Sequence, residues 1–432
     1  MKKIFLIYAV FFCCTWRAWL PAEEKPLDLA NLINEAYARN PKIKAVEKET
    51  QAYLFRIKPA QMLPDPMIEF SVKNMGLDQW MLGKDPNSGV GVSFSQVFPY
   101  FGKLKLAGDI ARKVYEGRLQ ALETVKLETA RDIKMAYFDL YYWQKAVEIL
   151  EKQKVLMQKT LALTETQYAV GSGAQNDIFK AQLEISRMEE MIIPMKAMIT
   201  TAEAKINLLL DYPAARPLGK PEGIDCETVP LTLPQLEETL LKQSPRLKEA
   251  QSMWEEKSIM VQAMRKEFKP DFRVTVGWGY KGKLPDMYEL MLGMEIPLFA
   301  GRKQQNRLQE ARVMAESAGL DSTAMRNDML TELNEYYLRA KTSENLVRLY
   351  KTRILPQARL ALEASFAAYP VNKTDFMALL SDISALFSAE LAYYRELSQL
   401  WGNLAALEAL IGGALFEKIA PPNPPTKAFD NK

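Results

Sequence analysis

Four short segments of the chain alternate between apolar residues and polar or small residues. Side chains of a strand point to opposite faces in turn, so this alternation predicts β-strands. The clearest segment sets Phe272, Val274, Val276, Trp278 and Tyr280 against Arg273, Thr275, Gly277 and Gly279. The predicted strands cover about 66–74, 89–98, 271–280 and 288–297. Each has one apolar face and one polar or glycine-rich face.

After each strand pair the apolar spacing becomes helical. Apolar residues step by four, three, seven and three positions from Ile133 to Leu150, which suits a helix packed along one stripe. The predicted helices are a long one over 102–168, its return over 175–210, one from Leu233 to about Glu267, a second long one over 302–366 with a kink at Pro356, and its return over 375–411. A helix of about 67 residues would reach on the order of 100 Å, more than a compact domain needs.

The two return helices, stacked end to end, would match one long helix in length. This match predicts a helical tube with two layers. The layers would join at a midway belt that contains residues 211–232 and the C-terminal tail, 412–432.

The same order of parts occurs twice, at a spacing of about 200 residues. PLDLANLINEAYARNPKIKA opens the first copy at Pro26, and PLTLPQLEETLLKQSPRLKEA opens the second at Pro230. We therefore divide the mature chain into a first repeat, 23–210, and a second repeat, 233–411. The predicted fold class is mainly α, with two strands and long antiparallel coiled-coil helices in each repeat.

Composition argues against an enzyme and against a nucleic-acid-binding protein. The 432 residues include no histidine, which removes the commonest general base and metal ligand. The net charge is +3 and no basic stripe stands out. The 21 methionines are scattered and are typical gap fillers of helical cores. We predict no catalytic residue, no cofactor and no metal site.

The N-terminus has the pattern of a secretion signal over residues 1–22. Lys2 and Lys3 precede a short apolar core, and Leu20-Pro21-Ala22 is a plausible cleavage site. Cys13 and Cys14 raise the alternative of a lipoprotein, although two phenylalanines precede them where small residues are expected. Cleavage would leave Cys226 as the one cysteine, so packing rather than a disulfide must hold the fold.

Two environments suit the alternating strands. One is a soluble sheet whose apolar face packs under helices. The other is a membrane sheet with lipid outside and water inside, favoured by strands of about nine or ten residues, by aromatic residues near the strand ends and by the export signal. Trp80, Phe98, Tyr100, Phe101 and Tyr288 are among these aromatic residues.

A sheet in lipid must close, because an open edge leaves backbone groups unpaired in hydrocarbon. Four strands cannot close, since outer-membrane barrels start at about eight. The chain is therefore expected to oligomerise. Three copies would give a twelve-stranded barrel with an open interior, and a dimer is the alternative by arithmetic.

The motifs YAVGSGAQNDIFKAQ, SQVFPYFGK and MEIPLFAGR, together with the duplication, resemble those of the TolC-type outer-membrane efflux proteins. The resemblance covers about 27–413. It implies a trimer that spans the outer membrane as a β-barrel and the periplasm as an α-helical barrel. It also implies two partners, a periplasmic adaptor and an inner-membrane pump. LPDPMIEF is more like the branch that serves heavy-metal and multidrug pumps of the resistance-nodulation-division type.

The resemblance also implies where the functional residues lie. Family members close the periplasmic end with a ring of side chains, often two aspartates one turn apart. Asp375 falls on the first position, Ala378 occupies the second, and Asp382 lies two turns on. Asp375 would equally suit a helix N-terminus. The residues expected at the adaptor-contacting helix tips are Tyr168, Gly171, Ser172, Gly173, Tyr369, Pro370 and Thr374.

These observations predict a passive exit duct for small toxic solutes, driven by a partner pump. One alternative keeps the fold but serves a type I protein secretion system. Another is a periplasmic coiled-coil scaffold with a small soluble sheet.

Overall fold

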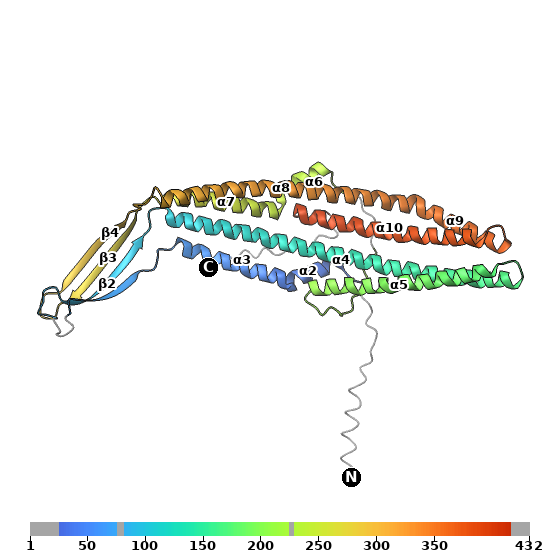
Figure 1. Cartoon of the computed structure of the whole chain (residues 1–432), viewed down its shortest axis with the longest axis horizontal. Coiled ribbons are helices and arrows are strands. Elements are labelled where there is room, and N and C mark those ends of the chain that lie inside the picture. Colours follow the sequence, from blue (N-terminus) through green and yellow to red (C-terminus); the bar gives the residue numbers. More distant parts are fainter. Residues whose placement is uncertain (1–25, 76–81, 224–228, 416–432) are drawn as a thin grey trace, which may run out of the picture.

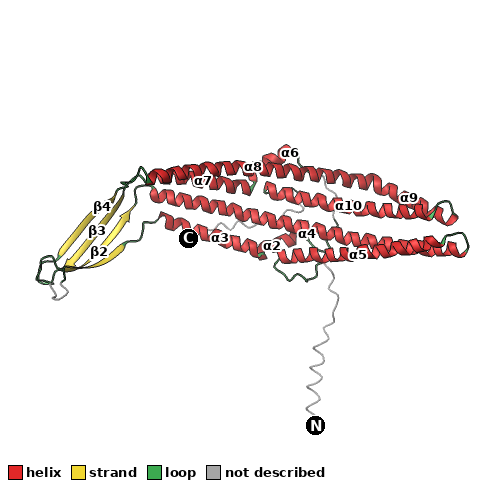
Figure 2. Cartoon of the chain, in the orientation of Figure 1, coloured by secondary structure: helices red, strands yellow, loops and turns green. Residues whose placement is uncertain are grey.

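The computed structural model describes residues 26–75, 82–223 and 229–415. The predicted signal peptide with its two cysteines, Trp80, Cys226 and most of the C-terminal tail lie outside these ranges. The described chain is elongated, with a four-stranded sheet at one end and helices along the rest (Figure 2).

The sheet is antiparallel and joins the two repeats. It consists of β1 (Met67–Lys73), β2 (Gly89–Phe98), β3 (Asp271–Tyr280) and β4 (Met287–Glu295), in the order β1-β2-β3-β4. The central β2–β3 pair comes from different repeats, and β1 and β4 are the edges. Strand β4 ends two residues before the predicted limit, close to Pro297, which has no N–H for a ladder.

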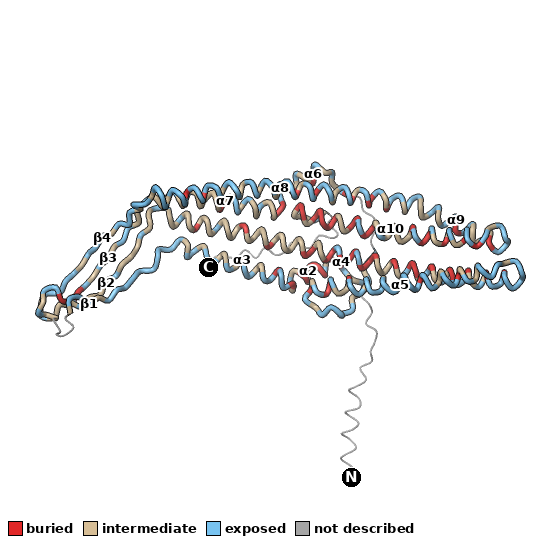
Figure 3. The backbone as a smooth tube through the Cα atoms, in the orientation of Figure 1, coloured by how far each residue is buried: buried red, intermediate tan, exposed pale blue. Residues whose placement is uncertain are grey.

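No described helix covers the apolar face of the sheet. Phe70 is 82% exposed, Leu292 is 76% exposed and Tyr288 is 81% exposed. Figure 3 shows that the sheet lies beyond the end of the helices and carries few buried residues. The alternative of a soluble sheet packed under helices is therefore wrong for the described chain. A continuous apolar face of this kind marks a surface that meets lipid or a partner.

The helices form a layer four elements wide. They are α2 (Leu29–Arg39), α3 (Pro41–Gln61), α4 (Lys103–Ala169), α5 (Gln175–Leu209), α6 (Leu233–Gln243), α7 (Pro245–Lys266), α8 (Lys303–Leu349), α9 (Leu355–Ala368) and α10 (Phe376–Ile411). Figure 1 shows α3 and α5 end to end beside α4, and α7 and α10 end to end beside α8 and α9.

This arrangement corrects the predicted stacking. Each return helix continues the line of the helix that opens its own repeat, instead of stacking on the other return helix. The line of α3 and α5 therefore spans the length of α4, and the line of α7 and α10 spans that of α8 and α9.

The second long helix is interrupted where a proline predicts a break. Residues Tyr350–Ile354 form a π-helical turn, and α9 begins at Leu355, directly before Pro356. Because Pro356 cannot donate an N–H, the regular ladder of hydrogen bonds cannot pass through it. The wider turn accommodates this gap without ending the helical path.

The helix predicted from Leu233 to Glu267 is two helices, α6 and α7. Pro245 forces the residue before it out of the helical region, and Ser244 takes φ −53° and ψ 120°. Asn40, before Pro41 in the first repeat, has nearly the same angles, φ −54° and ψ 123°. The duplication therefore extends to this bend.

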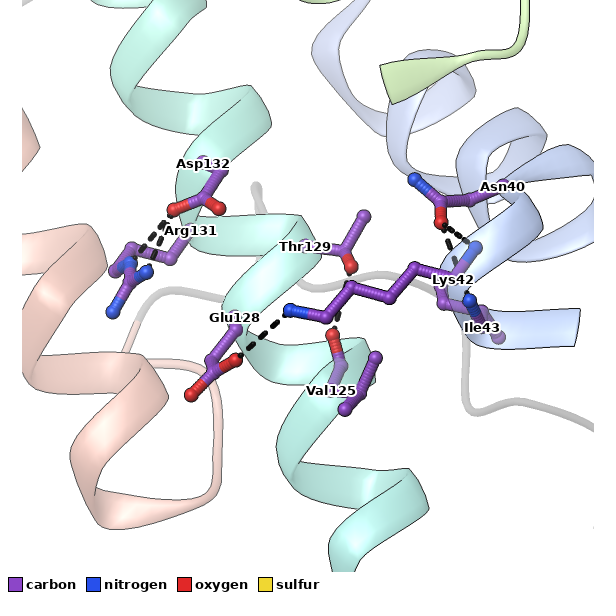
Figure 4. A network of polar contacts seen from close by, with 8 residues as sticks. All are labelled: Asn40, Lys42, Ile43, Val125, Glu128, Thr129, Arg131 and Asp132. Carbon is purple, nitrogen blue, oxygen red and sulfur yellow. Dashed lines mark hydrogen bonds and ion pairs between the residues drawn. The ribbon is translucent and has the colours of Figure 1, made fainter. Parts of the chain in front are cut away.

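Asn40 joins three helix ends at the bend of the first repeat. Its side-chain oxygen accepts the N–H groups of Lys42 and Ile43, which begin α3, as Figure 4 shows. Its side-chain nitrogen donates to the carbonyl of Leu209 at the end of α5, at 2.9 Å. An ion pair between Lys42 and Glu128, 3.6 Å long, adds a contact to α4 (Figure 4).

In the second repeat, a glycine brings the end of the return helix close to the bend between α6 and α7. Gly412, at the end of α10, has φ +83°. A Cβ there would lie 2.9 Å from the Pro245 ring and 3.0 Å from the Gln243 carbonyl. Only glycine allows α10 to approach the α6–α7 bend this closely.

The main hydrophobic core lies at these bends, midway along the helices. Ile33, Ile133, Leu236, Leu333 and Leu404 come from five helices and are all almost fully buried in one cluster. A second cluster lies between the midpoint and the tips and includes Met157, Met188 and Ile383. The bends are thus the most strongly packed part of the chain.

A charged pair is buried at the edge of the main core. Lys134 of α4 and Glu408 of α10 form an ion pair with side-chain exposures of 6% and 8%. Glu408 also accepts the N–H of Leu415 at 2.8 Å, so it holds the start of the C-terminal segment.

Helix α10 is long and apolar enough to cross a membrane by length and composition. Its buried residues, however, pack against α4, α8 and α9 within the layer.

We predict that Asn40→Ala lowers the free energy of unfolding by about 1–3 kcal/mol, because it removes a helix cap and leaves the Leu209 carbonyl without its donor. Ser244→Ala is the matched control, because Ser244 makes no side-chain cap bond. Urea unfolding followed by circular dichroism measures both. Equal losses in the two variants would contradict this role of Asn40.

We predict that Lys134→Met costs about 3–5 kcal/mol, because it leaves the Glu408 carboxylate buried without its partner. The double variant Lys134→Met/Glu408→Leu should recover part of this loss. Lys242→Ala, which removes an exposed pair with Glu238, should change stability by less than about 1 kcal/mol. Similar losses in the single and double variants would argue against a penalty from the unpaired charge.

Candidate functional site at the helical tips

Two helix reversals lie side by side at the end of the molecule opposite the sheet (Figure 1). The first joins α4 to α5 through residues 170–174, and the second joins α9 to α10 through residues 369–375. Gly171, with φ +76°, supplies the left-handed residue of the first turn, and Asn372, with φ 54°, that of the second. Both turns were predicted, and we call the two together the tip.

Gly173 does not have a positive φ, but it lies in a crowded position. A Cβ there would lie 3.0 Å from the backbone nitrogen of Tyr168 and 3.1 Å from the Cβ of Gln167. The Gln167 carbonyl accepts the N–H groups of Ser172 and Gly173 at 2.9 and 3.0 Å. The first turn is therefore wound tightly on the end of α4.

Tyr369 fastens the second reversal to the first. Its side chain is 4% exposed and packs against Phe376, with ring centroids 6.2 Å apart. Its hydroxyl lies 3.3 Å from the hydroxyl of Thr164, and its carbonyl accepts the Gln167 side-chain amide at 2.9 Å. Burial raises the pKa of the Tyr369 phenol, and the negative charge of Asp177 raises it further.

This placement separates Tyr369 from the other predicted tip residues. Tyr168, Gly171, Ser172 and Pro370 are exposed, and Thr374 and Gly173 are half-buried. The exposed group forms the outer surface of the tip. Tyr369 lies beneath it, where its side chain holds the two reversals together.

Asp375 caps α10 and remains exposed to solvent. Its side-chain oxygen accepts the N–H of Ala378 at 2.7 Å, the geometry of an N-cap. Ala378 itself is exposed on the first turn of the helix. The carboxylate is thus positioned by the backbone while one face remains open to water.

Asp382 is engaged within its own hairpin. Its carboxylate accepts a hydrogen bond from the hydroxyl of Ser365 on α9, the other helix of the hairpin, and the side chain is half-buried. Asp375 and Asp382 therefore do not have equivalent surroundings.

A cleft of about 500 Å³ separates the two reversals, and Asp177 lines it together with Asp375. The sequence interpretation missed Asp177, which lies in the first turn of α5. The duplication offered the signal, because QND before Ile178 corresponds to KTD before Phe376. Lys373 and Gln167 also line the cleft.

The described part of the chain contains no group of acidic or cysteine side chains arranged to hold a metal ion. The tip combines carboxylates, amides and hydroxyls on a rigid turn, and it has no nucleophile paired with a base. Its chemistry is that of a charged surface.

The comparisons with known proteins cover nearly the whole described chain. The family model of the outer membrane efflux protein matches twice, at residues 32–210 and 236–413. Each match falls on one of the two repeats, in agreement with the duplication.

Two relatives show the same breadth. The cobalt-zinc-cadmium resistance protein CzcC of Cupriavidus metallidurans is 20% identical over 391 residues, which cover 90% of each chain. The cation efflux system protein CusC of Escherichia coli K12 is 22% identical over 401 residues, or 89% of this chain and 86% of CusC.

A crystal structure of CusC has the same fold, with a TM-score of 0.77 at 17% identity over 89% of this chain and 92% of CusC. The described elements, the two repeats and the family match agree with one another. They also agree with a non-enzymatic transport role and a location in the outer membrane. The chain belongs to the outer membrane efflux protein family.

Proposed function

We propose that three copies of this chain form one continuous exit duct, with a twelve-stranded barrel in the outer membrane and a helical barrel in the periplasm. The carrying observation is the sheet, whose apolar face is uncovered and whose edge strands, β1 and β4, are unpaired in the described chain. In lipid, such edges must find partners.

The helical layer is open at the same two edges. On one side α3 and α5 pack on α4, and on the other α8 and α9 pack on α7 and α10. The outer helices carry exposed apolar side chains, such as Phe55 at 75% on α3 and Ile193 at 71% on α5, and Leu320 at 67% on α8 and Leu360 at 66% on α9. Sheet and helices therefore call for the same partner, a further copy placed edge to edge.

Edge-to-edge contacts between two different flanks are heterologous, so they generate a ring when the rotation closes. Two copies would give eight strands, which leave room for little more than side chains. Three copies give twelve strands and twelve helical positions around a lumen. Of these two rings, the trimer is the one that leaves a passage for solutes.

The concave face of the sheet suits a water-filled lumen. It carries Glu69, Lys73, Arg273 and Glu289 among serines and glycines, and these residues line a hollow of about 610 Å³ in the single chain. Polar residues inside and apolar residues outside are the arrangement of outer-membrane barrels.

At the other end of the duct, Asp375 is the candidate gate. A threefold axis would bring three Asp375 carboxylates into one ring at the tip, where they would attract cations. Asp382, bonded to Ser365, would contribute less charge to the passage.

The tip surface is the proposed contact with a periplasmic adaptor, through Tyr168, Gly171, Ser172 and Pro370. The inner-membrane pump would supply the energy, because the described part of this chain offers no reaction centre. Named relatives act in cation efflux and in cobalt-zinc-cadmium resistance. We therefore propose metal cations or other small toxic solutes as cargo, in preference to a secreted protein.

The oligomer is tested by the mass of the purified chain in detergent. We predict three chains per particle, by light scattering or native mass spectrometry, and single-channel conductance in planar bilayers. A monomer that stays soluble without detergent would exclude the duct and would favour the periplasmic scaffold.

The gate is tested by Asp375→Asn, which removes the charge but keeps an N-cap side chain, so stability should change by less than about 0.5 kcal/mol. We predict that block of the conductance by divalent cations weakens in this variant. Ala378→Asp, which adds a carboxylate one turn away, should strengthen the block. Unchanged block in Asp375→Asn would rule out Asp375 as the gate while leaving the duct intact.

A further inference from the structure

The strand-to-helix corner of the first repeat is fastened to the strand entry of the second. The corner ends at Lys103, and the entry is Asp271, the first residue of β3. The Asp271 carboxylate accepts the Tyr100 N–H at 2.7 Å and Lys103 Nζ at 3.1 Å. Lys103 also lies 3.3 Å from the Glu267 carboxylate, and its side chain is 12% exposed. This charge-assisted cluster fixes how α4 leaves the sheet.

The duplication supplies a second corner and a second entry at the open edges. Pro64-Asp65 before β1 repeats Pro270-Asp271, and Gly301-Arg302 after β4 repeats Gly102-Lys103 with one inserted residue, Ala300, ahead of it. Asp65 and Arg302 are both exposed. Neither forms an ion pair within the described ranges. One acidic and one basic group thus lack the partner that their counterparts have.

Two offsets relate the strands of the two repeats, up to the proline that follows β2 and β4. Pro99 corresponds to Pro297 at an offset of 198 residues, and Asp65 corresponds to Asp271 at an offset of 206. The first offset carries β2 onto β4, and the second carries β1 onto β3.

The observed hairpins agree with both offsets. In the first hairpin, Met67 of β1 pairs with Ser95 of β2. Applying the offsets to this pair gives Arg273 and Gly293, which are paired in the second hairpin. The two offsets therefore describe one consistent superposition of the two hairpins.

The same offsets convert the pairing between the repeats into a pairing between chains. Gly91 of β2 corresponds to Glu289 of β4 at the offset of 198, and Gly279 of β3 corresponds to Lys73 of β1 at the offset of 206. The observed Gly91–Gly279 pair therefore predicts that Glu289 of one chain lies opposite Lys73 of the next. An acidic side chain thus meets a basic one, although the two offsets are fixed by the positions of Pro99, Pro297, Asp65 and Asp271 alone. Cross-strand pairs of opposite charge are favourable.

Apolar residues also meet apolar residues in this register. The observed pairs Val92–Trp278 and Phe94–Val276 within the chain correspond to the predicted pairs Leu290–Val72 and Leu292–Phe70 between chains. All four derived positions lie on the exposed apolar face. A slip of one residue would turn each side chain to the wrong face, and a slip of two would separate Glu289 from Lys73.

We propose that β4 of one copy pairs with β1 of the neighbouring copy in this register, with Glu289 opposite Lys73 of the neighbour. Arg302 then reaches Asp65 of the neighbour, as Lys103 reaches Asp271 within the chain. The seam rests on the ring proposed above, and it repeats between chains the contacts that each chain makes between its repeats.

The single chain already places the seam residues on a common face. Lys73 Nζ lies 4.0 Å from the Glu289 carboxylate across the concave side of the sheet, and the side chains are 54% and 37% exposed. In water such a pair contributes little. At the seam, the ion pair would favour one strand register over the others that keep the apolar side chains on the same face.

Disulfide trapping tests the register in the exported chain, from which the predicted signal peptide with Cys13 and Cys14 has been removed, in a Cys226→Ser background. Two single-cysteine variants, Lys73→Cys and Glu289→Cys, are coexpressed and oxidised in detergent. Opposed strand residues have Cα atoms about 4.5–5.5 Å apart, within the range of a disulfide, whereas residues two positions away lie about 7–8 Å apart. The matched control therefore pairs Glu289→Cys with Ser71→Cys.

We expect a covalent dimer that disappears on reduction for the Lys73–Glu289 combination, and much less of it for the Ser71–Glu289 control. Stronger linkage in the control, or linkage in neither, would overturn the register. The mass of the detergent particle is measured on the same samples. A trimer without the expected linkage refutes the seam alone, whereas the absence of a trimer refutes the proposed duct.

Charge reversal tests the corner separately. Arg302→Glu should lower the temperature at which the oligomer dissociates, and adding Asp65→Arg should restore it. A double variant that is no more stable than Arg302→Glu would show that the two groups do not meet.

Discussion

The structure depends on one constraint, that backbone N–H and C=O groups cannot remain unpaired in hydrocarbon. A four-stranded sheet with an uncovered apolar face and two open edges is incomplete under that rule. The helices follow from the sheet, because each pair of strands leads into a long helix that continues the same lateral order. Strand edges and helix flanks are therefore open on the same two sides, and in the proposed ring one kind of neighbour would complete both.

Because the chain is duplicated, contacts between its two repeats can serve as the pattern for contacts between chains. Within the chain, β2 pairs with β3, and α4 packs on α7 and α10. The contacts between the two repeats within the chain are thus of the same kind as the contacts that the proposed ring would need between chains. The two repeats do not use identical chemistry, however. At the midway bends the first repeat uses the Asn40 side chain, and the second uses Gly412 to bring backbones close. Both residues hold a return helix against the bend between two shorter helices of the same repeat.

The tip shows how a stiff scaffold can carry a simple function. Gln167 and Tyr369 bind the two reversals together beneath the surface. The outer residues are then free to present charge and shape. Asp375 is positioned by the first turn of its helix, so its carboxylate needs no further support. The proposed duct would control passage by the positions of charges around its axis. It needs no pocket shaped to one solute.

The sequence by itself determined the duplication, the four strands, the two long helices with their turns, and the absence of histidine chemistry. These features are local, and periodicity, proline and glycine report local backbone preferences directly. Only the tertiary structure decided that each return helix continues α3 or α7, that Tyr369 is buried while Tyr168 is exposed, and that Asp382 bonds to Ser365. It alone also showed the apolar sheet face without a cover. Those outcomes depend on which surfaces meet across long separations in the chain, and a one-dimensional pattern does not specify a partner.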